Sequence, residues 1–193
     1  MKLVFATHNT HKLREVQQLL PTIIELLSLD DIGCTEEIPE TGETLEANAK
    51  LKADFVTQKY GLNCFSDDTG LLIDALGGAP GVYSARYAGP QKNANDNMDK
   101  VLRELKGNDQ RNAHFKTVIH LNLNGKSHVF DGIVNGMITQ AKQGAGGFGY
   151  DPIFKPKGYD STFGELSPKS KNAISHRGLA IQKLVSFFKN TEL

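Results

Sequence analysis

The spacing of apolar residues predicts that short strands and helices alternate along the chain. Short apolar runs indicate strands, and apolar residues three or four positions apart indicate helices. The expected strands are residues 3–6, 23–27 and 62–65, and the expected helices are residues 13–20, 44–60, 95–106 and 176–189. Pro21 and Gly61 stand where the first two helices would end. This order of elements predicts an α/β fold.

A long antiparallel hairpin is predicted in the middle of the chain. Asn124-Gly125, a dipeptide typical of two-residue turns, joins residues 115–123 to residues 126–139. Both segments alternate apolar and polar residues in part. Neither an internal repeat nor a linker divides the chain, so we expect a single domain over residues 1–193.

The composition narrows the class of protein. Of 193 residues, 39% are hydrophobic and 23% are charged, which is typical of a globular domain. The 22 basic and 22 acidic side chains cancel, whereas a surface that binds nucleic acid needs a basic excess. Cys34 and Cys64 lack metal-site spacing, so we expect small core residues. The apolar start is too short for a signal peptide, and we expect a cytoplasmic protein without membrane contact.

Two adjacent carboxylates form the most informative segment. Asp67 and Asp68, followed by Thr69, come directly after the apolar run 62–65. We therefore expect acids at the end of a strand, which is the edge where open α/β sheets bind ligands. Carboxylate oxygens suit Mg²⁺, which takes one or two of them and completes its coordination with water and substrate phosphate. The segment predicts a magnesium site.

The loop after the first strand predicts a phosphate site. It reads Thr7, His8, Asn9, Thr10, His11 and Lys12. Lys12 falls in the first helical turn, where an acidic residue would compensate the helix dipole, and the lysine instead adds to the positive charge of the free N–H groups. The alternative is that Thr7 or Asn9 only caps the helix, which is a common role of these residue types. The local sequence gives both interpretations similar weight.

A second group of polar residues surrounds the start of the helix at 44–60. Asn48 and Lys52 are about one turn apart and share a face, so both can approach one ligand. Glu40 and Glu43 precede this helix. They are either metal ligands or acids that stabilise a helix N-terminus, again with similar weight.

Two further segments predict contacts with a flat ring. Phe148 lies in the glycine-rich stretch 146–149, where the backbone can approach a ligand and the ring can stack on a base. The alternative, which this segment alone favours, is a loop whose aromatic residues belong to the core. Lys171, His176 and Arg177 are donors that would bind a keto oxygen and not an exocyclic amine. A basic start to a surface helix explains them equally well.

Five segments occur in a fixed order along the chain. They are ATHNTHKLREV at 6–16, ETGETLEANAKLKA at 40–53, SDDTGLLIDALGGAPGVYSARYAG at 66–89, GGFGYDPIF at 146–154 and KNAISHRG at 171–178. Together they resemble the inosine triphosphate pyrophosphatase family, whose members are also called dITP/XTP pyrophosphatases. The resemblance covers nearly the whole chain, and the bacterial members are the most similar.

The resemblance implies a fold, a reaction and a set of site residues. The implied fold is an elongated mixed α/β sheet with flanking helices, in two lobes around a central cleft, and the implied assembly is a homodimer. The implied reaction uses Mg²⁺ to hydrolyse the non-standard purine nucleoside triphosphates ITP, dITP and XTP to the nucleoside monophosphate and pyrophosphate. The implied metal ligands are Glu40 and Asp68, and Asp68 is also the implied proton acceptor.

The same resemblance assigns the substrate contacts. The implied triphosphate contacts are Thr7, His8, Asn9, Thr10, His11, Lys12 and Lys52, with Thr69 as a further substrate contact. The implied nucleoside pocket consists of Phe148, Gly149, Tyr150, Asp151, Lys171, His176 and Arg177. Many members of the family have Gly and Ser where this chain has His8 and Thr69. Thr69 keeps the hydroxyl, so we expect little loss there, whereas His8 leaves the course of the first loop open.

Two alternatives to this function remain at the level of sequence. One is a Maf-type pyrophosphatase for other modified nucleotides, and the other is a regulator that binds nucleotide without turnover. The segments 146–151 and 174–178 favour the purine enzyme. The acids at 67 and 68 argue against a simple binder, because they would repel a polyphosphate unless a metal intervenes. Whether Asp68 is the base or chiefly a metal ligand also remains open.

Overall fold

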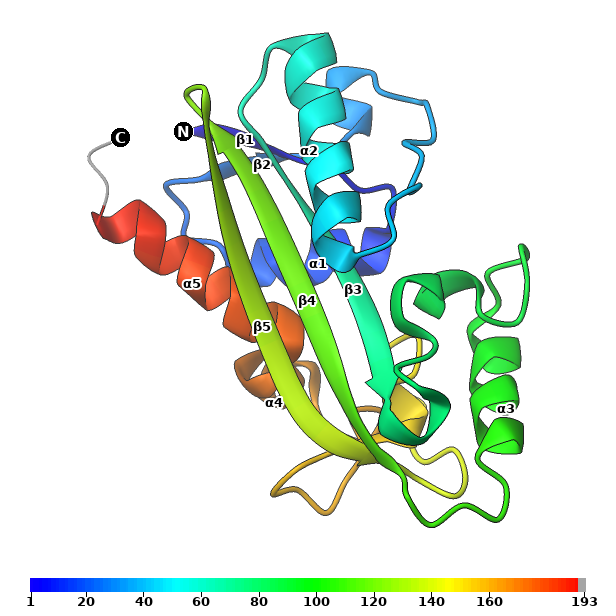
Figure 1. The fold of residues 1–193 in the computed structure, drawn as a ribbon. Helices are drawn as coiled ribbons and strands as arrows, with labels where there is room; N and C mark the ends of the chain where they lie inside the picture. The colour runs from blue at the N-terminus through cyan, green and yellow to red at the C-terminus, as the bar shows by residue number, and fades with distance from the viewer. Residues whose placement is uncertain (191–193) are drawn as a thin grey trace. The chain divides into compact units, whose positions relative to one another are not determined.

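The chain contains a six-stranded mixed sheet with the strand order β2-β1-β3-β4-β5-β6. The computed structural model describes residues 1–190 (Figure 1). The strands are β1 (Lys2–Phe5), β2 (Glu25–Leu27), β3 (Cys64–Ile73), β4 (Asn112–Leu123), β5 (Lys126–Ile138) and β6 (Phe154–Pro156). β1 pairs in parallel with β2 and β3, whereas β5 and β6 are antiparallel. The expected α/β class with a mixed sheet is confirmed.

Helices cover the sheet. They are α1 (Thr10–Leu19), α2 (Leu45–Tyr60), α3 (Ala94–Glu104), α4 (Pro168–Ile174) and α5 (His176–Asn190). Short 3-10 helices occupy Asp30–Ile32, Asp74–Leu76, Gly81–Arg86 and Asp151–Ile153. All but α4 lie where the apolar spacing predicts a helix, within a few residues at each end. α4 and β6 are too short for their apolar residues to show a period.

The chain divides into two compact units. The first contains residues 1–68, residues 117–132 and the described residues from 177 onward, and the second contains residues 69–116 and 133–176. β3, β4 and β5 each contribute residues to both units. Each unit has a hydrophobic core of its own.

In the first unit, α1 and α5 cover one face of the strands. Phe5 of β1 and Phe65 of β3 are buried there and stack with their ring centroids 4.6 Å apart. Val16 of α1 and Leu184 of α5 belong to the same cluster and are also fully buried. This apolar contact fixes α1 and α5 against the strands.

α2 covers the opposite face of the same strands. Val4 and Cys64 contact Val56 of α2 in this smaller cluster. The helix begins after Thr44, whose hydroxyl accepts a backbone N–H of the first turn, and it ends at Gly61. Gly61 has a φ of +65°, a conformation that favours glycine, so the predicted end of the helix is confirmed.

The second unit has an aromatic core. Phe115 and Phe154 meet edge to face at a centroid distance of 4.7 Å, and Phe163 stacks on Phe115 at 6.2 Å. Met98 and Val101 of α3 pack into the same cluster. Edge-to-face and offset aromatic pairs add to the stability that burial alone provides. The core therefore anchors β4, β6 and α3 to one another.

β3 corrects the expectation that a strand ends before the two acids. The strand continues from Cys64 to Ile73, so Asp67 and Asp68 lie inside it. The local sequence indicates a strand end because buried carboxylates normally oppose a strand interior. Cations from other elements compensate both acids, as described below, and the strand can therefore pass through them.

The hairpin and the cysteines follow the sequence-based expectations. Asn124 and Gly125 have φ values of +49° and +76°, as the two-residue turn between β4 and β5 requires. Cys34 and Cys64 are free and fully buried. Both expectations are confirmed.

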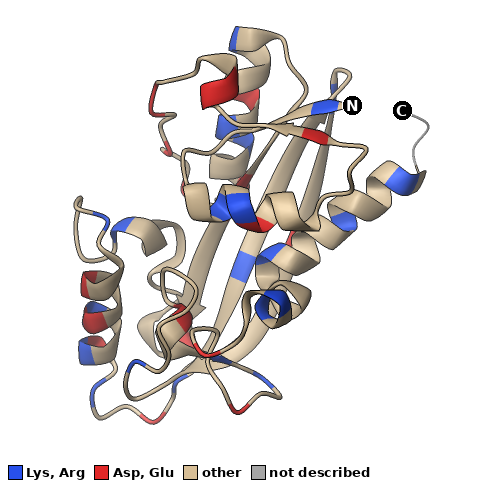
Figure 2. Cartoon of the chain, turned by 180° about the vertical axis from the view of Figure 1, so that it is seen from behind, with Lys and Arg blue, Asp and Glu red and all other residues tan. Residues whose placement is uncertain are grey.

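The described surface carries charges of both signs. Figure 2 shows basic and acidic residues together along α3, consistent with the zero net charge of the chain. Across residues 1–190, none of the helices combines the length and the apolar character that a bilayer-spanning segment needs.

Candidate active site

The loop between β1 and α1 is organised by the side chain of Asn9. Asn9 Oδ1 accepts hydrogen bonds from the backbone N–H of His11 at 3.0 Å and of Lys12 at 3.1 Å. Thr7 Oγ1 accepts the N–H of Asn9 at 3.1 Å. Asn9 therefore caps α1, and this cap uses two N–H groups that the phosphate interpretation left free. The binding of phosphate by the loop stays a prediction.

The same loop keeps an exposed face. His8, Thr10 and His11 are exposed, and the first turn of α1 contains no acidic residue. His8 Nε2 lies 2.9 Å from the carbonyl oxygen of Glu36, which fixes this side chain against the following loop. The positive end of α1 is thus uncompensated by acids of its own first turn.

Asp67 is a buried carboxylate held by cations from two helices. Lys12 Nζ of α1 donates to Asp67 Oδ1 at 2.8 Å, and Arg177 Nε of α5 donates to Oδ2 at 3.0 Å. Arg177 also pairs with Glu15 of α1 at 2.5 Å. Burial raises the pKa of Asp67, but Lys12 and Arg177 outweigh burial and hold this pKa well below its ordinary value. Asp67 therefore stays ionised and balances two buried cations.

Asp68 follows on the other face of β3, because successive strand residues point to opposite faces. There, Lys52 of α2 lies 3.7 Å from Asp68 Oδ1. The same Lys52 ammonium donates to Glu40 Oε1 at 2.5 Å and to the backbone oxygen of Asp67 at 2.8 Å. Burial lowers the pKa of Lys52, yet Asp68 and Glu40 outweigh burial and raise it. The Lys52 ammonium thus forms ion pairs with two carboxylates, those of Glu40 and Asp68.

This pair of carboxylates fits a divalent cation. Glu40 and Asp68 both approach the Lys52 ammonium, and burial raises the pKa of Asp68 above its ordinary value. Mg²⁺ would supply positive charge there and needs only one or two carboxylates. Within the described residues, no group of three His, Cys, Asp or Glu side chains could hold a metal ion. The site therefore fits Mg²⁺ with water and phosphate, and not a closed structural metal.

In the second unit, Asp151 organises the glycine-rich loop. Asp151 Oδ2 accepts the backbone N–H of Phe148 at 2.7 Å and Lys171 Nζ at 2.8 Å. The Lys171 ammonium lies 4.6 Å from the centroid of the Phe148 ring, within the range of a cation–π contact. Gly147 has a φ of +72°, and a Cβ there would lie 2.0 Å from Asp151 Oδ2. Only glycine fits, and the loop holds Phe148 beside a buried ion pair.

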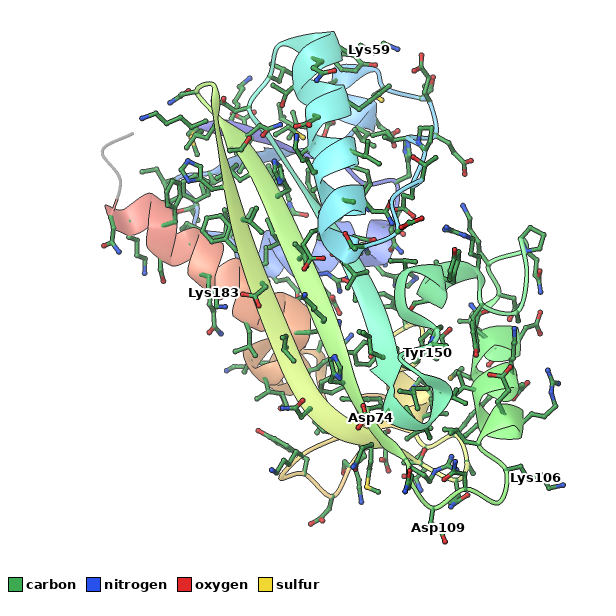
Figure 3. The ribbon with its side chains drawn as sticks, viewed as in Figure 1. Lys59, Asp74, Lys106, Asp109, Tyr150 and Lys183 are labelled. Atoms are coloured by element: carbon green, nitrogen blue, oxygen red, sulfur yellow. The ribbon has the colours of Figure 1, made fainter. Side chains whose placement is uncertain are left out.

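The second aromatic residue of this loop belongs to the core. Tyr150, labelled in Figure 3, is buried and donates its O–H to the carbonyl oxygen of Ser84 at 2.8 Å. Burial raises the pKa of this phenol, so it stays neutral. The core interpretation is confirmed for Tyr150. Phe148 is only half-buried, and its stacking role stays a prediction.

His176 and Thr69 complete the second group. His176 is buried at the start of α5 and stacks on Phe115, with ring centroids 4.4 Å apart and ring planes 18° apart. Thr69 is half-buried in β3, directly after Asp68. An imidazole fixed by ring stacking has a defined orientation, which suits a hydrogen-bonding role.

The structure sorts the expected site residues into two sets. The first unit contains residues 7–12, Glu40, Lys52, Asp68 and Arg177, and the second contains Thr69, residues 148–151, Lys171 and His176. The Arg177 guanidinium binds Asp67 and Glu15, and its contact with the base stays a prediction. The sequence indicated Asp67 only as part of the expected magnesium site and gave no role to Glu15. Only the three-residue spacing of Lys12 and Glu15, which places both on one face of α1, could have signalled their shared role.

Comparison with known proteins places the chain in a family. Residues 3–187 match the model of the Ham1 family. A dITP/XTP pyrophosphatase of Flavobacterium johnsoniae is 59% identical over 192 residues, covering 100% of both chains. A solved HAM1 protein from Coxiella burnetii has a TM-score of 0.92 at 38% identity, covering 99% of this chain and 100% of that one. The Staphylococcus aureus Ham1 protein has a TM-score of 0.91 at 36% identity, covering 100% of both chains.

The chain therefore belongs to the Ham1 family. The resemblance carried by the five sequence segments is confirmed.

Proposed function

We propose that the protein hydrolyses the non-standard purine nucleoside triphosphates ITP, dITP and XTP to the nucleoside monophosphate and pyrophosphate. The observation that carries this proposal is the convergence of two carboxylates, the half-buried Glu40 and the buried Asp68, on the ammonium of Lys52. Two neighbouring carboxylates are suitable ligands for a divalent cation. Such a cation would also offset the repulsion between these carboxylates and a bound triphosphate. The similarity to proteins named dITP/XTP pyrophosphatase supports the substrate class.

The first unit binds the triphosphate. Lys12 uses one of the three donors of its ammonium on Asp67, which leaves donors for phosphate oxygens. Thr10 and His11 expose the positive end of α1, where phosphate binds favourably. Glu40 and Asp68 would hold Mg²⁺, whose charge would neutralise phosphate oxygens.

Asp68 orients the attacking water and accepts its proton. The water oxygen bonds to the α-phosphorus, the bond from that phosphorus to the α–β bridging oxygen breaks, and pyrophosphate leaves with this oxygen and the electron pair. Burial raises the pKa of Asp68, which makes this carboxylate a better proton acceptor. Lys12 and Lys52 stabilise the negative charge that develops on pyrophosphate.

The second unit recognises the base. Phe148 stacks on the purine ring, and Lys171 and His176 provide donors for the 6-keto oxygen of hypoxanthine or xanthine. The amine of adenine would leave such donors buried without partners, which is a strong basis for rejection. The ion pair of Lys171 with Asp151 holds the ammonium in place.

Pyrophosphate release from ITP, XTP, GTP, ATP and dTTP, with Mg²⁺ and with EDTA, tests this function. We expect strong Mg²⁺-dependent release from ITP and XTP and little from GTP or ATP. Release mainly from dTTP would favour the Maf-type alternative. Nucleotide binding without release would favour a regulator.

The assembly and location complete the proposal. Residues 1–193 act as one pyrophosphatase domain, in a homodimer, in the cytoplasm where nucleotide pools are maintained. Zero net charge argues against nucleic acid as a partner. Light scattering of the purified protein measures the assembly directly, and the mass of a single chain would overturn the dimer.

A further inference from the structure

Asn48 links the loop that carries Glu40 to the helix that carries Lys52. It lies in α2, one turn before Lys52, and its side chain is fully buried. Asn48 Oδ1 accepts the backbone N–H of Gly42 at 2.7 Å. Gly42 follows Glu40 by two residues, so this bond fixes the backbone beside the metal-ligand candidate.

The contact between Gly42 and α2 leaves no room for a side chain at position 42. A Cβ there would lie 2.7 Å from Ala47 Cβ and 2.8 Å from Asn48 Oδ1, both closer than real Cβ contacts. Glycine at this position therefore permits the short hydrogen bond to Asn48. The loop and the helix form one fitted contact.

The hydrogen bond also determines how the amide of Asn48 is oriented. The N–H of Gly42 is a donor, so the atom that faces it must be the amide oxygen. The amide nitrogen, Nδ2, then points away from Gly42. Among residues 1–190, Nδ2 is buried and has no hydrogen-bond partner.

Stability alone does not account for asparagine at this position. A buried amide donor without an acceptor costs stability, and asparagine is also a poorer helix former than alanine or leucine. An apolar residue would avoid both costs in the helix. The benefit must therefore lie in the Gly42 contact and in what that contact positions.

We propose that Asn48 is a positioning residue that keeps Glu40 in place for the divalent cation. Lys52 Nζ holds the Glu40 carboxylate at 2.5 Å, but a cation would compete with this ammonium for the same oxygens. The bond from Gly42 to Asn48 involves the backbone and does not depend on the charge of Glu40. This hydrogen bond therefore keeps the loop in place when the Glu40 carboxylate leaves Lys52 and binds the cation. This inference rests on the proposed metal role of Glu40.

Binding of Mn²⁺ without nucleotide tests the inference, with Mn²⁺ as the probe for the divalent site. Isothermal calorimetry compares the full-length wild type with Asn48→Ala. We expect the variant to bind Mn²⁺ about tenfold more weakly, because groups that orient a metal ligand typically have effects of this size. We also expect faster hydrogen exchange at the Gly42 amide and a thermal midpoint close to that of the wild type.

Two further variants separate positioning from a general loss of structure. Asn48→Asp keeps the oxygen that accepts from Gly42, so the Gly42 amide should stay protected from exchange. Gly42→Ala disturbs the same contact from the loop and should weaken Mn²⁺ binding as well, even if Asn48→Ala fails to fold. Gln58→Ala, at an exposed position of the same helix, is the control and should match the wild type.

The outcomes distinguish this inference from the proposed function. If the wild type binds Mn²⁺ and both Asn48→Ala and Gly42→Ala bind it equally well, Asn48 is only structural and the inference is overturned alone. If the wild type itself binds no Mn²⁺ and hydrolyses ITP equally in EDTA, the metal role of Glu40 fails and the inference fails with it.

Discussion

The two faces of β3 in the first unit hold neighbouring carboxylates in opposite settings. On the face covered by α1 and α5, Asp67 is saturated by Lys12 and Arg177. On the face covered by α2, Asp68 shares Lys52 with Glu40. Burial opposes ionisation of both acids. The pKa of Asp67 is nevertheless lowered, whereas the pKa of Asp68 is raised. The cations that approach each acid thus hold Asp67 ionised, whereas at Asp68 the effect of burial prevails.

The largest expected effect is on turnover, at the α2 face. Asp68→Asn removes the proton acceptor and one metal ligand, so kcat for ITP should fall by ~10²–10⁴-fold, as loss of a general base does. Stability should change little, because burial already disfavours the charged form of Asp68. Steady-state kinetics and urea unfolding measure the two properties. A kcat near that of the wild type would show that Asp68 is not the proton acceptor.

The next largest effect is on folding, at the opposite face. Asp67→Asn leaves Lys12 and Arg177 buried without their shared counter-charge, which should cost about 3–5 kcal/mol of unfolding free energy. Asp131→Asn is the matched control, because its pair with Lys183 is exposed and should contribute less than about 1 kcal/mol. Equal losses in the two variants would show that Asp67 is not structural.

A smaller effect on substrate binding should arise in the second unit. Phe148→Ala removes a stacking surface worth about 1–3 kcal/mol, so KM for ITP should rise roughly 5- to 150-fold while kcat falls less. Tyr159→Ala, at an exposed aromatic residue of the same unit, should leave KM unchanged. A Phe148→Ala variant with a KM equal to that of the wild type would show that Phe148 only packs into the core and does not stack on the base.

The smallest effect is a pH dependence on the α2 face. His120 is buried, and burial lowers its pKa, although Asp54 opposes this. The unfolded chain then binds the proton more readily than the folded one. Stability is therefore complete above the ordinary histidine value of about 6.5 and declines as pH falls below it.

His120→Gln should remove this dependence. Between pH 7.5 and pH 5.5 the thermal midpoint of the wild type should fall a few degrees further than that of the variant. Thermal unfolding followed by circular dichroism makes the comparison. Equal slopes in the two proteins would mean that another group causes the acid sensitivity.

Local patterns in the sequence predicted much of the fold. Gly61 indicates the end of the helix from Leu45 to Tyr60, and Asn124-Gly125 indicates the hairpin turn. Both signals are local, because a helix end and a two-residue turn depend on nearby residues. The continuation of β3 through its acids was not predictable in this way. One compensating cation, Arg177, lies 110 residues away from Asp67 in sequence. Charge compensation over that separation leaves no local signal.

The candidate site shows the same division. The residue types at Glu40, Lys52 and Asp68 indicated a metal and phosphate site, and the structure brings these three together. The sequence indicated Asp67 and Asp68 as one acidic pair, because a strand that ends at these acids would not place them on opposite faces of a sheet. The sequence also indicated that Asn48 approaches a ligand together with Lys52. It gave no sign of the contact between Asn48 and Gly42, which depends on the path of a loop.

Phosphorus NMR of ITP turnover tests the central claim most directly. With Mg²⁺, the account predicts inosine monophosphate and pyrophosphate in equal amounts, and no turnover when EDTA removes the metal. Inosine diphosphate and orthophosphate as products, or undiminished turnover in EDTA, would contradict it.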